Sequence, residues 1–187
     1  IAAAVALGAS VSPEAGFARK NYFYPDLPKG YQITQHGRPV ARGGHLDVSV
    51  DGAVSRIRIR QIHVEEDAGK SRHGEPGAGK ASLLDMTRCG VPLLEIVTEP
   101  DIADVDEADA FLTELRSVLV RLGIAECNMH EGGLRFDTNV SLRREDEERG
   151  TQTEVKNLNS FRSVRRALSF EIERQRSVLE AGGRVEY

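Results

Sequence analysis

The sequence predicts an α+β fold, with an antiparallel sheet in the first half of the chain and strands mixed with helices after it. Three stretches, 31–35, 45–50 and 54–66, are rich in β-branched residues or alternate apolar and polar side chains. Residues 104–122 instead carry apolar side chains at helical spacing. A run of strands followed by strands mixed with helices favours α+β over a parallel α/β architecture.

The first half of the chain is expected to begin with the end of a helix at 1–9. Strands 31–35, 45–50 and 54–66 are predicted to form an antiparallel meander, and Asp51-Gly52 is a hairpin signal between the last two. Residues 68–82 are rich in glycine and small or charged residues, which predicts a long mobile loop. Two further strands are expected at 82–86 and 92–99.

The second half is expected to contain two helices separated by two strands. Acidic residues near the start of 104–122 and Gly123 after its end mark the first helix. Strands are predicted at 134–143 and 152–158, on either side of a charged tip. Ser160 is the expected N-cap of a second helix that runs to about Glu180 and ends before Gly182-Gly183.

Composition places limits on the class of protein. A chain of 187 residues with 40% hydrophobic content suits one globular domain, and a net charge of -4 excludes an overall basic field. Cys89 and Cys127 are far apart and lack zinc-ligand spacing, which favours reduced thiols. The apolar opening is too short to span a bilayer, so a soluble protein is expected. A first residue other than Met indicates a piece of a longer protein.

Strand 54–66 contains an irregularity that affects Glu66. Ile57 and Ile59 are odd-numbered whereas Ile62 and Val64 are even-numbered, which predicts a β-bulge near Arg60-Gln61. The shifted register places Glu66 on the inward face, where a carboxylate needs a cation, a proton or several donors. The alternative is an acid at the strand end that curls into solvent.

Glu95 lies between Leu93-Leu94 and Ile96-Val97, so burial is expected on either face of its strand. A buried glutamate is either neutralised by a structural arginine or bound to a hard cation such as Mg2+. Glu66 and Glu95, from neighbouring strands, are the predicted metal-binding pair. His63 and His73 are each either a ligand or polar surface.

One face of the last two predicted strands is polar. Leu134, Phe136, Val140 and Leu142 alternate with a polar set and are expected to face the core. This polar face is either plain solvent surface or the floor of a cleft that binds phosphates and positions a metal. Its members are Arg135, Asp137, Asn139, Ser141, Glu154, Lys156, Asn157 and Asn159.

Aromatic and basic residues gather in "ARKNYFYPDLPKGYQ", residues 18–32. Tyr22, Phe23, Tyr24 and Tyr31 lie between Arg19-Lys20 and Lys29. Some of the rings are expected to pack as core at a proline-rich corner, and this packing would hold the cations in place. By contrast, "GEPGAGKAS" (74–82) is rejected as a P-loop, because Ala81 stands where Ser or Thr is required.

Five stretches, taken in order, resemble one family. They are "FARKNYFYPDLPKGYQITQ", "IHVEEDAGKSRH", "LLDMTRCGVPLLEIVTEPD", "NMHEGGLRFDTNVSLR" and "TEVKNLNSFRSVRRALSFEIERQ". Together they are similar to the kinase and transamidase subunit (B) of the bacterial and organellar aspartyl/glutamyl-tRNA amidotransferase, over nearly the whole chain. The resemblance implies that residues 1–187 are part of one glutamine-synthetase-like cradle domain, an antiparallel sheet with helices packed on one side.

The resemblance also implies a ligase that uses ATP and Mg2+. Such enzymes phosphorylate the side-chain carboxylate of Glu-tRNA(Gln) or Asp-tRNA(Asn) and amidate it with ammonia. The implied partners are the amidase subunit (A) that releases this ammonia from glutamine, the small subunit (C) and the misacylated tRNA, with no DNA and no membrane. The expected location is the bacterial cytoplasm, or a mitochondrion or plastid for an organellar protein.

Carried onto this chain, the resemblance implies roles for particular residues. Glu66 and Glu95 resemble the metal-binding acids, and Arg19 and Lys20 are candidates for binding phosphate or the tRNA terminus. The further catalytic candidates are Asp137, Asn139 and Lys156, and the cofactor-binding candidates are Arg135 and Asn157. The family's N-terminal strand with Glu-x-His and its C-terminal helical and tail domains have no counterpart here. This piece alone is therefore expected to be inactive.

Two other functions remain open at this point. The first is a scaffold that docks the amidase subunit and tRNA without ATP chemistry. The second is a stand-alone carboxylate-amine ligase that needs no tRNA. A glutamate enclosed by an apolar strand argues against a pure scaffold.

Overall fold

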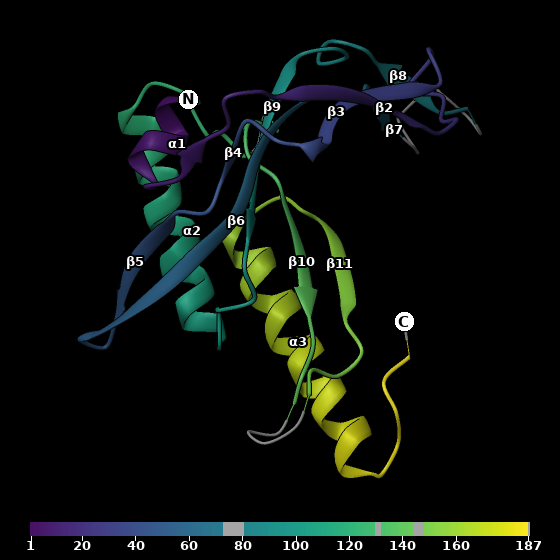
Figure 1. Cartoon of the computed structure of the whole chain (residues 1–187). Coiled ribbons are helices and arrows are strands. Elements are labelled where there is room, and N and C mark those ends of the chain that lie inside the picture. The colour runs from purple at the N-terminus through teal and green to yellow at the C-terminus, as the bar shows by residue number, and fades with distance from the viewer. Residues whose placement is uncertain (73–80, 130–131, 144–147, 187) are drawn as a thin grey trace. The chain divides into compact units, whose positions relative to one another are not determined.

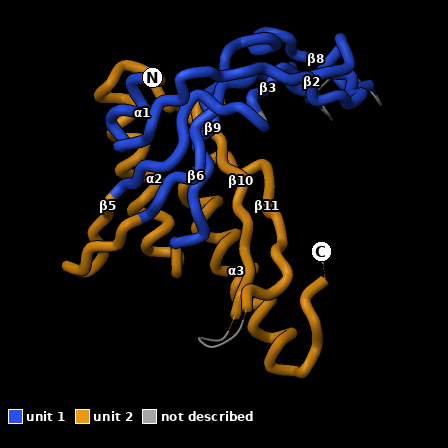
Figure 2. Tube along the Cα trace, in the orientation of Figure 1, with its two compact units in different colours: residues 1–46, 57–101 blue, residues 47–56, 102–187 orange. Residues whose placement is uncertain are grey.

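The computed structural model describes residues 1–72, 81–129, 132–143 and 148–186. The chain forms two compact units (Figure 2). Unit 1 comprises residues 1–46 and 57–101, and unit 2 comprises residues 47–56 and 102–187. The described residues form helices and antiparallel strand pairs, whereas the cradle architecture and the assignment of 1–187 to one domain stay predictions.

The main sheet has the strand order β1-β4-β6-β5, and β9 pairs with β6 as well (Figure 1). Two separate hairpins, β2-β3 and β7-β8, accompany it. The elements up to residue 101 are α1 (Ala2–Ala6), β1 (Ser10–Val11), β2 (Gly16–Asn21), β3 (Tyr31–Arg38), β4 (Ala41–Arg42), β5 (His45–Val50), β6 (Ala53–Glu66), β7 (Lys70–Arg72), β8 (Leu83–Asp85) and β9 (Pro92–Thr98).

The predicted meander is wrong in one respect, because β3 does not join β5 and β6 in a sheet. It pairs instead with β2, from Asn21 opposite Tyr31 to Gly16 opposite Arg38. Two turn hydrogen bonds, Leu27 N to Tyr24 O and Gly30 N to Leu27 O, fold the corner between these strands. The turn at 24–30 therefore brings β3 against β2, in a hairpin separate from the main sheet.

The predicted loop at 68–82 is also partly wrong. Lys70–Arg72 forms strand β7, which pairs with β8 from Lys70 opposite Asp85 to Arg72 opposite Leu83. The predicted strand at 82–86 is confirmed as β8, and that at 92–99 is confirmed as β9. Residues 73–80, including His73 and most of the rejected P-loop stretch, lie outside the described residues, as do 144–147 of the charged tip.

Two details of β5 and β6 match the expectations from the sequence. Asp51 and Gly52 have φ values of 50° and 83°, as a two-residue hairpin turn requires, and glycine adopts such values without strain. The register between β6 and β9 shifts between Ile59 and Gln61, which confirms the bulge. Because of this shift, Ile57, Ile59 and Ile62 are all buried.

Unit 2 contains both long helices, α2 (Val105–Arg121) and α3 (Phe161–Glu180), and the hairpin of β10 (Phe136–Val140) with β11 (Thr153–Leu158). Asp104 caps α2 by accepting hydrogen bonds from Asp106 N and Glu107 N, and Ser160 caps α3 by accepting one from Ser163 N. Both predicted helices are thus confirmed. No helix in the described part of the chain has the length and apolar character needed to cross a membrane.

A buried polar network joins α3 to the β10-β11 hairpin. The side chain of Gln175 is fully buried, and its Oε1 accepts a hydrogen bond from Leu142 N at 3.0 Å. Its Nε2 lies 3.1 Å from Val140 O, 2.9 Å from Thr153 Oγ1 and 2.8 Å from a carboxylate oxygen of Glu171. A polar group that is buried in this way contributes to stability only while its partners remain.

Glu171 makes the stability of this network dependent on pH. The hydrogen bonds from Arg174 outweigh burial and, with those from Thr153 and Gln175, lower the pKa of Glu171 from 4.5 to about 2. A lowered pKa in the folded state stabilises the protein above pH 4.5, and this contribution disappears as the pH falls from 4.5 towards 2. Urea titrations across this range are expected to show the loss.

The variant Glu171→Gln is expected to be less stable near neutral pH and to lose this part of the pH dependence. Glu173→Gln is the matched control, because Glu173 is exposed on the same helix and pairs with Arg176. If the Glu171→Gln protein keeps the same slope of stability against pH as the wild type, Glu171 is not the group responsible.

Candidate functional site

Three side chains of unit 1 form a cluster at the junction of β6 and β9. His63 lies opposite Glu95 in the strand pairing, and Glu65 follows two residues later on the same face of β6. His63 Nε2 is 2.9 Å from Glu95 Oε2 and 3.9 Å from Glu65 Oε2. The ligand atoms of all three residues lie within 4.8 Å of one another. We call His63, Glu65 and Glu95 the β6-β9 cluster.

Neighbouring side chains hold the cluster in position. Gln61 Nε2 lies 3.4 Å from His63 Nδ1, and Thr34 Oγ1 donates to Glu65 Oε2 at 3.4 Å. The main chain between the two β6 members is fixed as well, since Val64 N donates to Gln35 Oε1 at 2.9 Å. Because alternate side chains of a strand share a face, His63 and Glu65 have a common direction, towards Glu95.

The electrostatics of the β6-β9 cluster favour a positive charge at its centre. The hydrogen bond to Glu95 raises the pKa of His63, although burial acts in the opposite direction. Burial and the negative charge of Glu95 raise the pKa of Glu65. The hydrogen bond to His63 lowers the pKa of Glu95 in spite of burial. Two carboxylates that lie this close attract either a proton or a metal ion.

The ligand types of the cluster fit a divalent cation. Carboxylate oxygens suit Mg2+ and Mn2+, and an imidazole nitrogen is a good ligand for Mn2+ and for later transition metals. The described residues contain no other group of three such side chains with this proximity. The β6-β9 cluster is therefore the best candidate metal centre in the described part of the chain.

The two predicted metal ligands are in different surroundings. Glu95 belongs to the cluster, whereas Glu66 accepts a hydrogen bond from Ile33 N at 2.7 Å and forms an ion pair with Lys29. Burial opposes ionisation of Glu66, but the contacts with Lys29 and Ile33 outweigh it and lower the pKa of the carboxyl group. The need of Glu66 for a cation and donors is confirmed, and its role as a metal ligand stays a prediction.

The expected burial of Glu95 is wrong, because 48% of its side chain is exposed. Among the described strands, β9 pairs with β6 alone, so one edge of β9 has no neighbouring strand. The apolar residues on either side of Glu95 are only half-buried. Their presence next to Glu95 in the sequence therefore did not imply an enclosed strand.

The cluster member that the sequence-based prediction missed is Glu65. It stands next to Glu66 in "VEED", and only the register of β6 against β9 decides which of the two faces Glu95. The bulge was a usable signal, because it placed Glu66 with Ile62 and Val64 and therefore placed Glu65 on the face of His63. Residue type alone does not separate two adjacent glutamates.

The β2-β3 hairpin explains why rings and cations are concentrated in residues 18–32. Arg19 Cζ lies 4.8 Å from the centre of the Tyr31 ring, and Lys29 Nζ lies 4.7 Å from the same centre. Lys20 Nζ is 5.9 Å from the Tyr22 ring. The rings thus hold cations by cation-π contacts. The expected core packing is wrong for Tyr22, Phe23, Tyr24 and Tyr31, none of which is buried.

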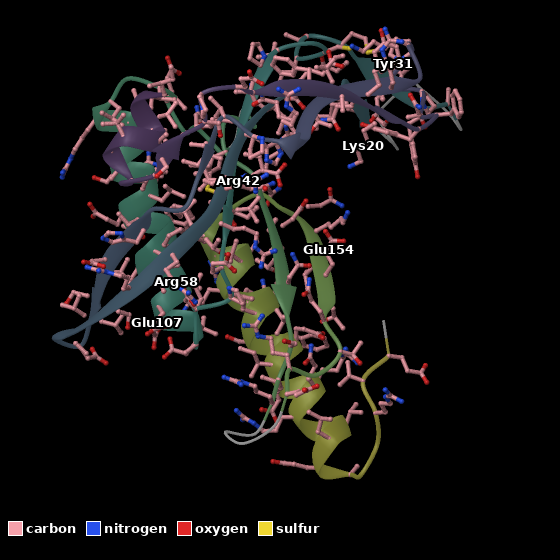
Figure 3. All side chains as sticks on the ribbon, in the orientation of Figure 1. Lys20, Tyr31, Arg42, Arg58, Glu107 and Glu154 are labelled. Carbon is pink, nitrogen blue, oxygen red and sulfur yellow. The ribbon has the colours of Figure 1, made fainter. Side chains whose placement is uncertain are left out.

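The register of β2 and β3 gives Arg19 and Lys20 opposite directions. Asn21 pairs with Tyr31 and Arg19 with Ile33, so Arg19 shares a face with Tyr31. Lys20 pairs with Gln32 on the other face, which also carries Thr34, the partner of Glu65. Figure 3 shows Lys20 and Tyr31 on this hairpin. The positive charge of Lys20 favours the ionised forms of Glu65 and Glu95.

Replacing Lys29 by methionine is expected to raise the pKa of Glu66. The ion pair and hydrogen bond with Lys29 are lost, and burial, which disfavours the charged carboxylate, is then opposed mainly by Ile33 N. The measurement is a pH titration of carboxyl carbon chemical shifts. Lys70→Met is the control on β7, and an unchanged Glu66 pKa in Lys29→Met would show that the ion pair is absent in solution.

The predicted polar face belongs to unit 2. Exposed and covered residues alternate along β10, so Asp137 and Asn139 are exposed while Val140 is buried. Asn139 pairs with Glu154 on β11, labelled in Figure 3. Lys156 is exposed as well, and its Nζ lies 3.2 Å from Glu154 Oε2. This confirms a shared polar face.

Two more candidates lie beside this face. Arg135 is exposed just before β10, and Asn157 is exposed on β11. Asn157 has φ of 63° at a bulge where Asp137 opposes two residues of β11, a conformation that asparagine tolerates. The catalytic and cofactor-binding roles of Arg19, Lys20 and these unit 2 residues stay predictions.

Comparison with known proteins gives a consistent result. Residues 1–186 match the family model described as the GatB/GatE catalytic domain. The aspartyl/glutamyl-tRNA(Asn/Gln) amidotransferase subunit (B) of Moorella thermoacetica is 54% identical over 184 residues, which cover 98% of this chain and 39% of that protein. The proteins of the same name from Geotalea daltonii and Geobacter sulfurreducens are 51% and 53% identical over 187 residues, covering 99% of this chain and 39% of each relative.

These matches confirm the resemblance found in the sequence. They also show that the chain spans only 39% of the length of these relatives. The family model, in contrast, is matched by nearly the whole of this chain. The chain therefore belongs to the GatB/GatE catalytic domain family.

Proposed function

We propose that this chain forms part of the catalytic centre of an enzyme that amidates Glu-tRNA(Gln) or Asp-tRNA(Asn). The observation that carries the proposal is the family match over residues 1–186, together with relatives named as a subunit of aspartyl/glutamyl-tRNA(Asn/Gln) amidotransferase. The β6-β9 cluster adds a group of side chains suited to phosphate chemistry.

The proposed reaction has two steps. A side-chain carboxylate is a poor electrophile, because its leaving group would be oxide. One carboxylate oxygen therefore attacks the γ-phosphorus of ATP, which gives an acyl phosphate and ADP. Ammonia then attacks the acyl carbon, phosphate leaves with the former carboxylate oxygen, and loss of a proton gives the amide.

In this proposal Glu65 and Glu95 bind Mg2+ through carboxylate oxygens, and His63 is their third partner. When bound, the ion would offset the charge of the ATP phosphates beside the substrate carboxylate. Gln61 and Thr34 hold His63 and Glu65 in position. Lys29 and Ile33 N both contact Glu66 Oε1, so Glu66 would become a ligand through Oε2 or by giving up its contact with Lys29.

Lys20 is proposed to bind the carboxylate or phosphate that approaches the cluster. It lies on the same face of the β2-β3 hairpin as Thr34, and its charge acts on both Glu65 and Glu95. Arg19 faces the other way, over Tyr31, so its proposed ligand is a phosphate of the tRNA terminus. Asp137, Asn139, Lys156, Arg135 and Asn157 are proposed to contact the nucleotide.

The proposed enzyme works with other chains. We expect it to act with an amidase subunit (A) that supplies ammonia from glutamine, a small subunit (C) and the misacylated tRNA. The proposed location is the bacterial cytoplasm, or a mitochondrion or plastid for an organellar form. The alternative function is a scaffold that docks the amidase subunit and the tRNA and has no ATP chemistry of its own.

An isotope experiment tests the proposal. The full-length protein, assembled with its partner subunits, is given tRNA charged with glutamate or aspartate whose side-chain carboxylate carries 18O. The expected result is one 18O atom in each inorganic phosphate released, since an acyl phosphate passes that oxygen to phosphate. Phosphate without the label would overturn the mechanism, and equal activity on free glutamate would favour a stand-alone ligase.

A further inference from the structure

Two arginines of α3 differ from the others on that helix. The helix contains five arginines, and three of them pair with carboxylates: Arg165 with Asp106, Arg174 with Glu171, and Arg176 with Glu173. Arg162 and Arg166 are exposed, and neither has a carboxylate partner among the described residues. Their charge is therefore not used within the described part of the fold.

These two arginines share one side of α3 with an exposed ring. Residues 162, 166 and 170 are four positions apart and so lie along one face of the helix. Phe170 is 70% exposed, whereas Val164, Glu171 and Gln175 are the buried residues of α3. We call Arg162, Arg166 and Phe170 the α3 strip.

Helix stability does not account for the α3 strip. Arginines in the first turns of a helix oppose its dipole, which favours acidic residues there, and the first turn of α3 has none. The nearby acids do not cancel the charge either, because Asp106 and Asp109 are the partners of Arg165. The strip is thus a local positive surface on a chain whose net charge is -4.

We propose that the α3 strip binds RNA, with Arg162 and Arg166 on phosphates and the Phe170 ring stacked on an unpaired base. Guanidinium groups bind phosphate oxygens in pairs of hydrogen bonds, and aromatic rings stack on bases of any type. The inference rests on the proposed function, in which the substrate is a tRNA, and adds a contact outside the groups assigned to catalysis.

A protein partner fits the strip less well. A specific protein interface buries about 800 Å2 on each side and has an apolar centre. Phe170 and Leu179 are the exposed large apolar residues of α3. Leu179 is nine positions from Phe170, which is half a turn out of phase with it. One isolated ring next to two cations matches a stacking contact better than the centre of a protein interface.

The test measures the affinity of the full-length protein for uncharged tRNA at several salt concentrations, by fluorescence anisotropy. For Arg162→Gln with Arg166→Gln, the slope of log affinity against log salt is expected to become shallower by about 1.4 to 1.8, since each phosphate contact contributes about 0.7 to 0.9. Phe170→Ser is expected to weaken binding about tenfold without changing the slope. Arg176→Gln on the same helix is the control and is expected to match the wild type.

An unchanged salt slope in the double arginine variant overturns the proposal. If the same variant also loses an amidotransferase subunit from the complex, the strip is a protein interface instead. Thermal unfolding of each variant identifies any that fails to fold. If the double arginine variant does not fold, the milder Arg166→Lys takes its place. Weakened tRNA binding by Arg166→Lys is then the expected result, and unchanged binding contradicts the proposal. If the phosphate released in the 18O experiment carries no label but the double arginine variant still has the shallower salt slope, only the proposed chemistry is refuted, and RNA binding by the α3 strip is still supported.

Discussion

Replacing Glu95 by glutamine is expected to lower tRNA-dependent ATP cleavage about 1000-fold, which corresponds to about 4 kcal/mol of lost transition-state stabilisation. The change removes the negative charge of one of the two carboxylates in the β6-β9 cluster and weakens the 2.9 Å contact with His63. Glu65→Gln is expected to have an effect of similar size. Both are measured as ADP release by the full-length assembled enzyme at saturating ATP.

Glu99→Gln is the matched control for these variants. Glu99 follows β9 directly and its carboxylate lies 3.1 Å from Arg60, outside the cluster. Its loss is expected to leave ATP cleavage at the wild-type rate. Glu66→Gln separates the two possible glutamate pairs: if it abolishes cleavage while Glu65→Gln does not, the ligand beside Glu95 is Glu66 and the assignment of Glu65 is wrong.

The second large effect is expected on stability. Gln175→Leu should lower the free energy of unfolding by about 3 kcal/mol, because it leaves buried groups without their partners. Leu142 N loses its acceptor, and Val140 O and Thr153 Oγ1 lose a donor. The measurement is equilibrium unfolding in urea at neutral pH.

Gln152→Leu provides the comparison, since Gln152 is exposed just before β11. It is expected to change the free energy of unfolding by no more than about 0.5 kcal/mol. If the Gln175→Leu and wild-type proteins are equally stable, the hydrogen bonds of Gln175 contribute no more to the free energy of unfolding than a buried apolar side chain of similar size does.

Local signals in the sequence predicted the helices and one hairpin well. Ser160 caps α3 with the expected hydrogen bond, and Asp104, where the first helix was expected to begin, is the N-cap of α2. Asp51-Gly52 forms the expected turn because few residue pairs adopt two consecutive positive φ values. Such features depend only on residues that are close in the sequence, so they can be predicted without knowledge of the tertiary structure.

Features that depend on distant pairing were predicted less well. The sheet partner of β3 is β2 rather than β5, and no pattern in residues 31–38 distinguishes the two. Likewise Glu65, and not Glu66, lies with His63 beside Glu95, and the place of Glu95 opposite His63 follows only from the register of β6 against β9. Alternation within a strand shows which residues share a face, but it does not show what lies opposite them.

The exposure of Glu95 has a similar cause. Its neighbours in the sequence are apolar, yet they are half-buried, because β9 has a described strand on one side only. A solvent-accessible carboxylate next to a buried histidine is better suited to binding a ligand that exchanges with solvent than an enclosed carboxylate would be. The prediction of burial was therefore wrong, and the proposed role of Glu95 rests instead on its proximity to His63 and Glu65.

The most direct test of the central claim is pulsed electron paramagnetic resonance of Mn2+ bound to the full-length protein. With 15N-labelled histidine, the proposal predicts coupling of the ion to one imidazole nitrogen, lost in His63→Gln, and much weaker Mn2+ binding in Glu65→Gln and Glu95→Gln. If Mn2+ binds all three variants as tightly as it binds the wild type, and the histidine coupling is intact, the assignment of the β6-β9 cluster as the metal centre is contradicted.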